Sequence, residues 1–496
     1  MLRIAPAIGC LNRCLPSWND KWGRAYVFAC TFMVYMCYHI SRKPISVVKS
    51  VFHQNCSEVA EKNGKTIVPE NATFCDWKPF DGENYDSLFG VLDVVFLSSY
   101  AISMFFSGHA ADKFHLRHFL SLGSVLCGLS TIAFGLGFFF EIHSFTFYVI
   151  AQIVGGIFQA SGWPAVVACM GNWFGKSSRG LFMGIWSAHT SIGNILGSVI
   201  AGAFVDYAWG WSFVVPGLVI AASGVLTFFF LLPYPEEVDV LPPERGVAKE
   251  QFDYAVQSSV ETVGTSSSVS LSTVSEPDVT NEPYSAACDS DSQPLSGNVT
   301  EGGAVSFLTA LRVPGVIEYS LSLLFSKMVS YTFLFWLPNY IRDAGGFDPS
   351  AAADLSTIFD LGGIFGGIMA GFLADQSLAS ATVCVVMLIA AIPTLYLYYV
   401  YGVVSVAHCV GLLIPLGLLV NGPYALITTA VSADLGTHPT LQSNSRALAS
   451  VSGIIDGTGS VGAALGPLLC GLLKPYGWFA VFLMLITACA FSALVS

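Results

Sequence analysis

The stretch Tyr35-Met-Cys-Tyr-His-Ile-Ser-Arg-Lys-Pro44 lies near the end of the first long apolar run. A cation at bilayer depth costs about 2.5–3.5 kcal/mol even on permissive insertion scales, so such residues point to a functional site. The polar side chains recur at the spacing of one helical face: Tyr35, Tyr38, His39, Arg42, Ser46 and Lys49. We therefore expect one polar stripe that lines a cavity and receives an anion. The alternative is that Arg42 and Lys43 flank a helix and extend to the membrane interface.

The composition predicts a membrane protein. The 496 residues are 54% hydrophobic and 11% charged, whereas soluble domains carry about 25% charged residues. Apolar runs long enough to cross a bilayer recur along the chain, which predicts an all-α fold in contact with lipid. No basic cluster longer than Arg42-Lys43 appears in the sequence, so we expect no nucleic-acid partner. No metal-ligand spacing appears in the sequence either, and we expect neither a metal nor a cofactor.

Twelve spans are expected, six on each side of a polar segment. They cover about 24–51, 85–108, 117–140, 145–170, 181–204 and 211–232, then 313–342, 351–374, 379–401, 405–431, 446–473 and 476–496. The connections after the second and fourth spans are basic, whereas those after the third and fifth hold no Lys or Arg. By the positive-inside rule, the basic connections and both termini lie in the cytosol.

The connection between the first two spans, residues 52–85, has the features of a luminal or extracellular loop. It carries two glycosylation sequons, at Asn55 and Asn71. Cys56 and Cys75 in the same loop lie outside the apolar runs. Because disulfides persist in oxidising compartments, we expect a Cys56–Cys75 disulfide. The charge rule places this loop on the same side, opposite the cytosol.

The polar segment 234–304 is rich in Ser, Thr, Asp, Glu and Pro. It cannot bury enough apolar area to offset its ordering entropy, so we expect a disordered acidic cytosolic linker. It separates an N-terminal half, 23–233, from a C-terminal half, 305–496. Residues 1–22 lack the apolar core and cleavage site of a signal peptide and are expected to form a cytosolic tail. The apolar run that reaches residue 496 leads us to expect further C-terminal residues.

The two halves repeat one another. Gly108-x-x-x-Asp112 ends the second span, and Gly371-x-x-x-Asp375 ends the eighth. Trp209-Gly-Trp opens the sixth span as Tyr476-Gly-Trp opens the twelfth. Two six-helix halves related by a parallel repeat are the architecture of the major facilitator transporters. At the cytosolic ends of their helices, Asp112 and Asp375 are expected to make gating contacts between helices.

Five longer motifs are more specific. They are Tyr38-His-Ile-Ser-Arg-Lys43, Phe158-Gln-Ala-Ser-Gly-Trp-Pro164, Asn172-Trp-Phe-Gly-Lys-Ser-Ser-Arg-Gly180, Gly184-Ile-Trp-Ser-Ala-His-Thr-Ser-Ile-Gly-Asn194 and Trp336-Leu-Pro-Asn-Tyr340. With them the chain, apart from its tail and linker, resembles the organophosphate:phosphate antiporters, and most of all the eukaryotic sugar-phosphate exchangers of solute carrier family 37. The resemblance implies exchange of a sugar phosphate or glycerol phosphate, of the glucose-6-phosphate or glycerol-3-phosphate type, for inorganic phosphate. It also implies alternating access between the halves and residence in the endoplasmic reticulum membrane.

The resemblance assigns substrate-binding roles to residues at matching positions. Arg42 stands at the place of a phosphate-binding arginine, His189 at that of a histidine near the substrate, and Tyr100 at that of a tyrosine on helix 2. Ser187 belongs to the same motif as His189. The remaining expected members of the site come from the stripe, namely Tyr35, Tyr38 and His39. The alternative for His189 is a packed histidine that bonds a neighbouring carbonyl.

The seventh span departs from the family pattern. Bacterial members carry a second phosphate-binding basic residue six positions before the motif tryptophan, where this chain has Ser330. Lys327 lies three residues earlier, on nearly the same helical face and about 4.5 Å along the axis. We expect Lys327 to supply the second charge of the phosphate site, and a structural ion pair is the alternative.

Other charges within the spans need partners. Because Lys43 lies about 100° round the helix from Arg42, it is expected to point elsewhere and to pair with a carboxylate. Asp360, in the middle of the eighth span, is the expected partner, and this ion pair would link the two halves. Asp93 and Asp456 are further acids within the spans, and the sequence assigns them no partner.

Three other functions remain open. A proton-coupled symporter of an uncharged sugar or other organic solute would use the acids of the spans as coupling groups. A membrane enzyme such as a phosphatase needs a nucleophile and a base at one site, and no such cluster lies near His189 in the sequence. We therefore expect no enzymatic activity. A scaffold or receptor without transport activity is the third class.

Overall fold

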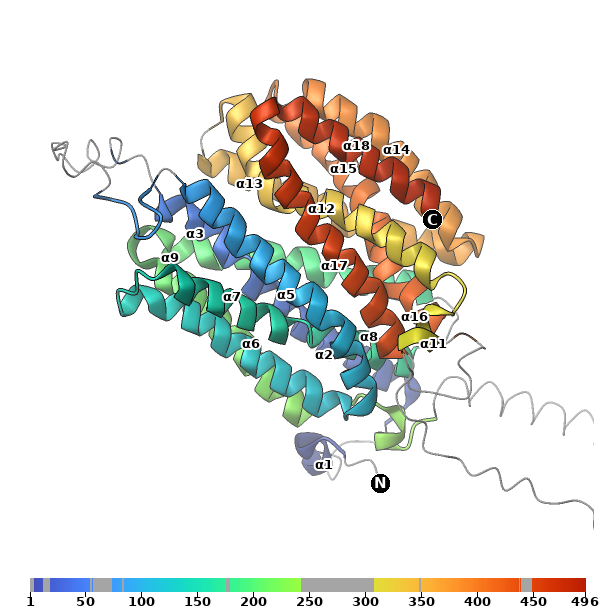
Figure 1. Ribbon diagram of the computed structural model, residues 1–496. Coiled ribbons are helices and arrows are strands. Elements are labelled where there is room, and N and C mark those ends of the chain that lie inside the picture. The colour runs from blue at the N-terminus through green and yellow to red at the C-terminus, as the bar shows by residue number, and fades with distance from the viewer. Residues whose placement is uncertain are drawn as a thin grey trace, which may run out of the picture.

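The computed structural model describes residues 4–11, 18–53, 56, 74–82, 84–174, 179–241, 307–347, 349–436, 438 and 448–496. The regular elements within these ranges are all helices, and the helices of the two halves gather in two groups (Figure 1). The predicted sequons at Asn55 and Asn71 lie outside the described residues, as does the predicted linker beyond residue 241.

The N-terminal half is built from α1 (Pro6–Leu11), α2 (Asp20–Arg42), α3 (Pro44–Phe52), α5 (Tyr85–Lys113), α6 (Leu116–Phe139), α7 (Phe145–Gln159), α8 (Gly162–Trp173) and α9 (Arg179–Phe230). Helix α9 contains both the fifth and the sixth expected spans. They meet at Ala208, whose φ of −160° and ψ of 77° are not helical. A short 3₁₀ helix, Pro235–Val238, follows.

The C-terminal half is built from α11 (Phe307–Leu311), α12 (Val316–Gly345), α13 (Pro349–Ser377), α14 (Ser380–Tyr401), α15 (Val406–Leu426), α16 (Ser432–Gly436), α17 (Leu448–Leu473) and α18 (Trp478–Val495). A π-helical segment, Ile427–Val431, joins α15 to α16. The tenth expected span therefore contains a local widening of the helix, a feature that often occurs at functional sites.

In the described part of the chain, 11 helices are long and apolar enough to cross a membrane, and they match the second to twelfth expected spans. The first expected span is formed by α2 and α3, whose polar stripe lowers their apolar content. The prediction of one continuous helix over 24–51 is wrong, because the chain bends at Lys43 between them. Pro44 causes the bend, since proline lacks an N–H and its ring clashes with the preceding turn.

The two halves meet along two equivalent helix pairs: α5 packs on α17, and α13 packs on α9. These are the second and eleventh spans and the eighth and fifth, as the internal repeat requires. Glycines permit this close approach. A Cβ atom on Gly108 would lie 2.5 Å from the carbonyl oxygen of Ala449, and one on Gly371 would lie 2.1 Å from that of Gly180. A larger residue at either position would therefore push the halves apart.

The described residues between α3 and α5 pack against the N-terminal half. Cys56 and Cys75 form a disulfide, with their Cα atoms 5.6 Å apart. Nearby, the ring of Phe52 stacks on that of Phe80 and meets the edge of Trp209, at centroid distances of 4.7 and 4.8 Å. These aromatic contacts join the end of α3 to α9.

The first residues of the predicted linker are packed against the N-terminal half. Just before the linker, at the end of the predicted N-terminal half, the indole N–H of Trp173 donates to the carbonyl of Leu232 at 2.8 Å. Glu237 is buried, and its carboxylate accepts a hydrogen bond from Arg117 at 2.9 Å. The ordered N-terminal half therefore extends beyond its predicted boundary at residue 233.

Candidate functional site

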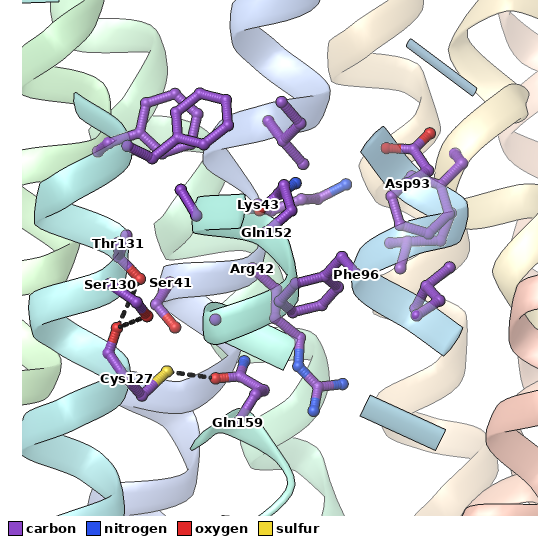
Figure 2. Close-up of a pocket in the computed structure, with 18 of the residues that line it drawn as sticks. Ser41, Arg42, Lys43, Asp93, Phe96, Cys127, Ser130, Thr131, Gln152 and Gln159 are labelled. Atoms are coloured by element: carbon purple, nitrogen blue, oxygen red, sulfur yellow. Dashed lines mark hydrogen bonds between the residues drawn. The ribbon is translucent and has the colours of Figure 1, made fainter. Parts of the chain in front are cut away.

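A cavity lies between the N-terminal half and α12. Its polar lining comes mainly from α2, α5, α6, α7 and α9: Ser41, Arg42, Lys43, Asp93, Ser130, Thr131, Gln152, Gln159 and Asn194. Helix α12 contributes Tyr331, Leu334 and Phe335. Figure 2 shows Arg42 and Lys43 where α2 ends. The lining is therefore mixed: polar side chains lie among apolar ones such as Phe96, Phe134 and Phe213, and it carries charges of both signs.

Arg42 joins the two halves at this cavity. Its Nη1 donates to the hydroxyl of Tyr331 on α12 at 3.2 Å. Its guanidinium lies 4.6 Å from the centroid of the Tyr100 ring on α5, a cation–π contact. The side chain is thus held by one residue from each half.

The remaining donors of Arg42 are uncommitted. Its Nε and Nη2 atoms are buried and make no hydrogen bond to any of the described residues. Buried N–H groups normally have partners, because leaving one unsatisfied costs about 1–3 kcal/mol or more. A guanidinium that presents two neighbouring donors matches two oxygens of one oxyanion. The geometry therefore suits a bidentate anion such as phosphate.

Lys327 is buried and forms an ion pair within the C-terminal half. Its Nζ lies 2.5 Å from Oδ1 of Asp456 on α17 and 3.3 Å from the Ser460 hydroxyl. The second carboxylate oxygen of Asp456 accepts a hydrogen bond from Tyr100 at 3.1 Å. Asp456, to which the sequence assigned no partner, thus connects Lys327 to the tyrosine beneath Arg42.

The predicted ion pair between Lys43 and Asp360 is not a direct contact in this structure. Lys43 and Asp360 lie close enough to interact electrostatically across the halves. Within the described residues they form no direct salt bridge. Asp93, the other acid left without a partner by the sequence, makes a salt bridge with Lys49 of α3 beside the cavity.

His189 lies in a cluster of aromatic rings behind the cavity wall. Its ring centroid is 4.4 Å from that of Trp186 and 4.9 Å from that of Tyr35. His39 lies next to this cluster, 5.2 Å from Tyr35, and its Nδ1 is 3.2 Å from Oδ1 of Asn194. None of His189, His39 and Tyr35 is among the described lining residues of the cavity, and their direct contact with substrate stays a prediction.

Two further predicted residues point away from the cavity. The Tyr38 hydroxyl hydrogen bonds with Ser161 at 3.0 Å and Ser124 at 3.1 Å, which ties α2 to α6 and α8. The Ser187 hydroxyl donates to the carbonyl of Gly184 in its own helix at 2.7 Å. Neither residue is among the described lining residues, so a substrate role for either requires another conformation of the halves.

Asp112 and Asp375 each cap a helix of the opposite half. Asp112, at the end of α5, accepts from the backbone N–H groups of Ala449 and Ser450 at 3.1 and 2.9 Å. Asp375, near the end of α13, accepts from those of Gly180 and Leu181 at 2.9 and 2.7 Å. Each carboxylate satisfies N–H groups in the first turn of α17 or α9 and faces the positive end of the helix dipole. The two contacts hold the halves together at this end.

Sequence reasoning missed three members of the site: Tyr331, Asp456 as the partner of Lys327, and Asn194. Tyr331 follows Lys327 by four residues and therefore lies on the same helical face, a signal that was present in the sequence. Asp456 and Asp360 are both acids within spans of the same half as Lys327, so the sequence offered Asp456 as one of the candidate partners. Asn194 has no comparable signal, because its contacts depend on where α9 lies beside α2.

Comparisons with known proteins agree with the resemblance that the sequence motifs indicated. The family model of the Major Facilitator Superfamily matches residues 79–443. The chain is 51% identical over 473 residues to the glucose-6-phosphate exchanger SLC37A2 of Mus musculus, which covers 95% of this chain and 90% of the relative. It is 52% identical over 470 residues to SLC37A2 of Danio rerio, with coverages of 95% and 90%. It is 45% identical over 501 residues to the glucose-6-phosphate exchanger SLC37A1 of Homo sapiens, with coverages of 96% and 93%.

Proposed function

The chain belongs to the Major Facilitator Superfamily, among the sugar-phosphate exchangers of solute carrier family 37, and we propose that it exchanges a sugar phosphate for inorganic phosphate. The named relatives are glucose-6-phosphate exchangers, so the substrate we propose for this chain is a hexose phosphate. The proposed activity is transport, without chemical conversion of the substrate.

The observation that carries this proposal is the state of Arg42. It lies where α2, α5 and α12 meet, and its Nε and Nη2 are buried without partners among the described residues. A phosphate group bound there would accept both hydrogen bonds at once. Inorganic phosphate and a phosphate ester share these oxygens, so one site can bind the two substrates in turn, as exchange requires.

Lys327 supplies the second positive charge in this proposal. Asp456 neutralises it in the present structure, because a buried cation without a counter-ion is strongly unfavourable. A phosphate dianion that reaches Arg42 competes with Asp456 for Lys327. Since Arg42 and Lys327 belong to different halves, shared binding of one anion would draw the halves together around it.

Alternating access requires the capping contacts of Asp112 and Asp375 to break. They close one end of the interface, whereas the cavity lies away from that end, beside Ile45 at the start of α3 and Asp93 in the first half of α5. We propose that the closed end faces the cytosol, as the basic connections and the sequons in the opposite loop predict. We further propose that the protein resides in the endoplasmic reticulum membrane with both termini in the cytosol.

Flux through proteoliposomes tests the proposal. Vesicles loaded with phosphate and containing the full chain should accumulate labelled glucose-6-phosphate without a pH gradient, and vesicles without internal phosphate should not. Protein-free vesicles and an Arg42→Ala variant are the controls. Uptake that needs a proton gradient but no internal phosphate would instead establish a proton-coupled symporter.

A further inference from the structure

One wall of the cavity, formed by α6 and α7, carries polar groups that the proposed phosphate site does not use. Ser130 and Thr131 both line the cavity. Both hydroxyls donate to the same backbone carbonyl, that of Cys127, at 2.7 and 3.0 Å (Figure 2). A hydroxyl has one proton and two lone pairs. With their protons committed inside α6, these two side chains offer only acceptors to the cavity.

Gln152 on α7 adds an amide to this wall. It lines the cavity, and none of the hydrogen bonds among the described residues involves its side chain. Gln159, two turns along the same helix, differs: its Nε2 donates to the carbonyl of Tyr38 at 3.0 Å, and its Oε1 accepts from the thiol of Cys127 at 2.7 Å. The Gln159 amide therefore has a structural role, whereas the Gln152 amide remains available to a ligand.

The cavity thus contains two chemically different regions. The guanidinium of Arg42 attracts an oxyanion, but the lone pairs of Ser130 and Thr131 would repel one. Neutral O–H donors are the groups that acceptor-only hydroxyls bind, and an amide can both donate to and accept from such a group. A binding site with buried polar groups prefers a hydroxylated ligand to an analogue that lacks those hydroxyls, because the analogue leaves the polar groups without partners.

We infer that Ser130, Thr131 and Gln152 bind the hydroxyl groups of the sugar while Arg42 binds the phosphate. The inference rests on the proposed function and assigns the preference for sugar phosphate to the α6–α7 wall. Inorganic phosphate contacts the Arg42 region alone. A hexose phosphate, which has more hydroxyls than a glycerol phosphate, gains more from the wall.

Exchange kinetics in proteoliposomes with the full chain test this assignment. The variants are Ser130→Ala, Thr131→Val, Gln152→Leu and their combination. Each single change is expected to raise the KM for glucose-6-phosphate by about three- to tenfold, the value of one neutral hydrogen bond, and the combination should raise it further. The KM for inorganic phosphate should change much less, so the ratio of the two KM values is the readout.

Matched controls come from α9. The hydroxyls of Ser223 and Thr227 also donate to backbone carbonyls of their own helix, at 2.7 and 2.8 Å, but they lie outside the cavity lining. Ser223→Ala and Thr227→Val should leave both KM values at the wild-type level. Phosphate exchange measured on the same vesicles shows whether each variant is folded.

Deoxy analogues of glucose-6-phosphate make the test specific. An analogue that lacks a recognised hydroxyl should bind the wild-type protein more weakly, and this difference should vanish in the variant that lost the partner group. If the loss from the analogue and the loss from the variant simply add, that hydroxyl and that side chain are not partners. An unchanged ratio of the two KM values in the triple variant would overturn this inference and leave the proposed function intact. A wild-type protein that exchanges phosphate but no sugar phosphate would overturn the proposed function and this inference together.

Discussion

The Nζ atom of Lys327 lies 2.5 Å from Oδ1 of Asp456, and Tyr100 of the opposite half donates to Oδ2 of the same carboxylate at 3.1 Å. The Tyr100 ring lies beneath the guanidinium of Arg42. One acid therefore connects the two cations that we expect to bind phosphate. It neutralises the cation of the C-terminal half and positions the ring that supports the cation of the N-terminal half.

Removing the charge of Asp456 should release Lys327 for substrate. We expect Asp456→Asn to lower the KM for phosphate, since the anion no longer competes with a carboxylate. Lys327→Ala should raise it about tenfold or more, because a hydrogen bond to a charged group contributes about 1.5–3 kcal/mol. Phosphate exchange at varied concentrations measures both effects. A Lys327→Ala protein with an unchanged KM would assign Lys327 to a structural ion pair only.

Arg42 is expected to need its planar pair of donors as well as its charge. Arg42→Lys keeps the charge but cannot donate two parallel hydrogen bonds to one phosphate. We expect it to lower the kcat/KM for phosphate exchange by about tenfold or more. The control is Arg24→Lys, since Arg24 lies on the same helix but is partly exposed and pairs with Asp20 at 2.8 Å. Equal activities of Arg42→Lys and the wild type would contradict a bidentate site.

Lys43 and Asp360 should depend on one another. Each single change, Lys43→Met or Asp360→Asn, leaves the other charge between the halves without its counter-charge, and we expect each to reduce transport strongly. The double variant should recover part of the lost rate. Initial rates of phosphate exchange, with protein amounts matched, provide the measurement. Losses that simply add in the double variant would show that the two charges act independently.

The capping aspartates should each protect one helix end. Asp112→Ala removes the acceptor for two N–H groups of α17, and the loss of a helix cap costs about 0.5–2 kcal/mol. Amide hydrogen exchange over 448–455 should rise by about two- to thirtyfold, with no change over 179–186. Asp375→Ala should give the reverse pattern, so each variant controls for the other. If amide exchange over 448–455 and 179–186 is the same in both variants as in the wild type, neither contact limits opening of the interface.

The carboxyl group of Glu237, which lies outside the spans, is expected to make the stability of the folded protein depend on pH. Burial raises the pKa of Glu237 from its usual 4.5 to about 7, although the neighbouring Arg117 opposes this shift. Because the folded protein holds this proton more tightly than the unfolded chain, stability should fall as the pH rises from 4.5 to 7. Thermal unfolding of wild type and Glu237→Gln measures it. The variant should lack this part of the slope, and identical slopes would contradict the prediction.

Periodicity and composition determined the spans, the two halves and the polar stripe. These features follow from local rules: an apolar run must cross the bilayer as a helix, and a cation within such a run indicates a functional site. The same rules located Arg42 and Lys327 as charges within spans. They overlooked local deviations such as the bend at Lys43, where the proline after a polar stripe interrupts a run that reads as one helix.

Only the tertiary structure decided which of these charges meet. Lys327 pairs with an acid 129 residues later, and Tyr100 reaches the same acid from 356 residues away. No local pattern encodes such distances, because they depend on how four helices from two halves pack together. For the same reason Tyr38, one turn from Arg42 on the polar stripe, bonds inside its own half, whereas Arg42 reaches α12. The sequence identified the residues that we expect to carry the chemistry, and packing determined which of them face the cavity.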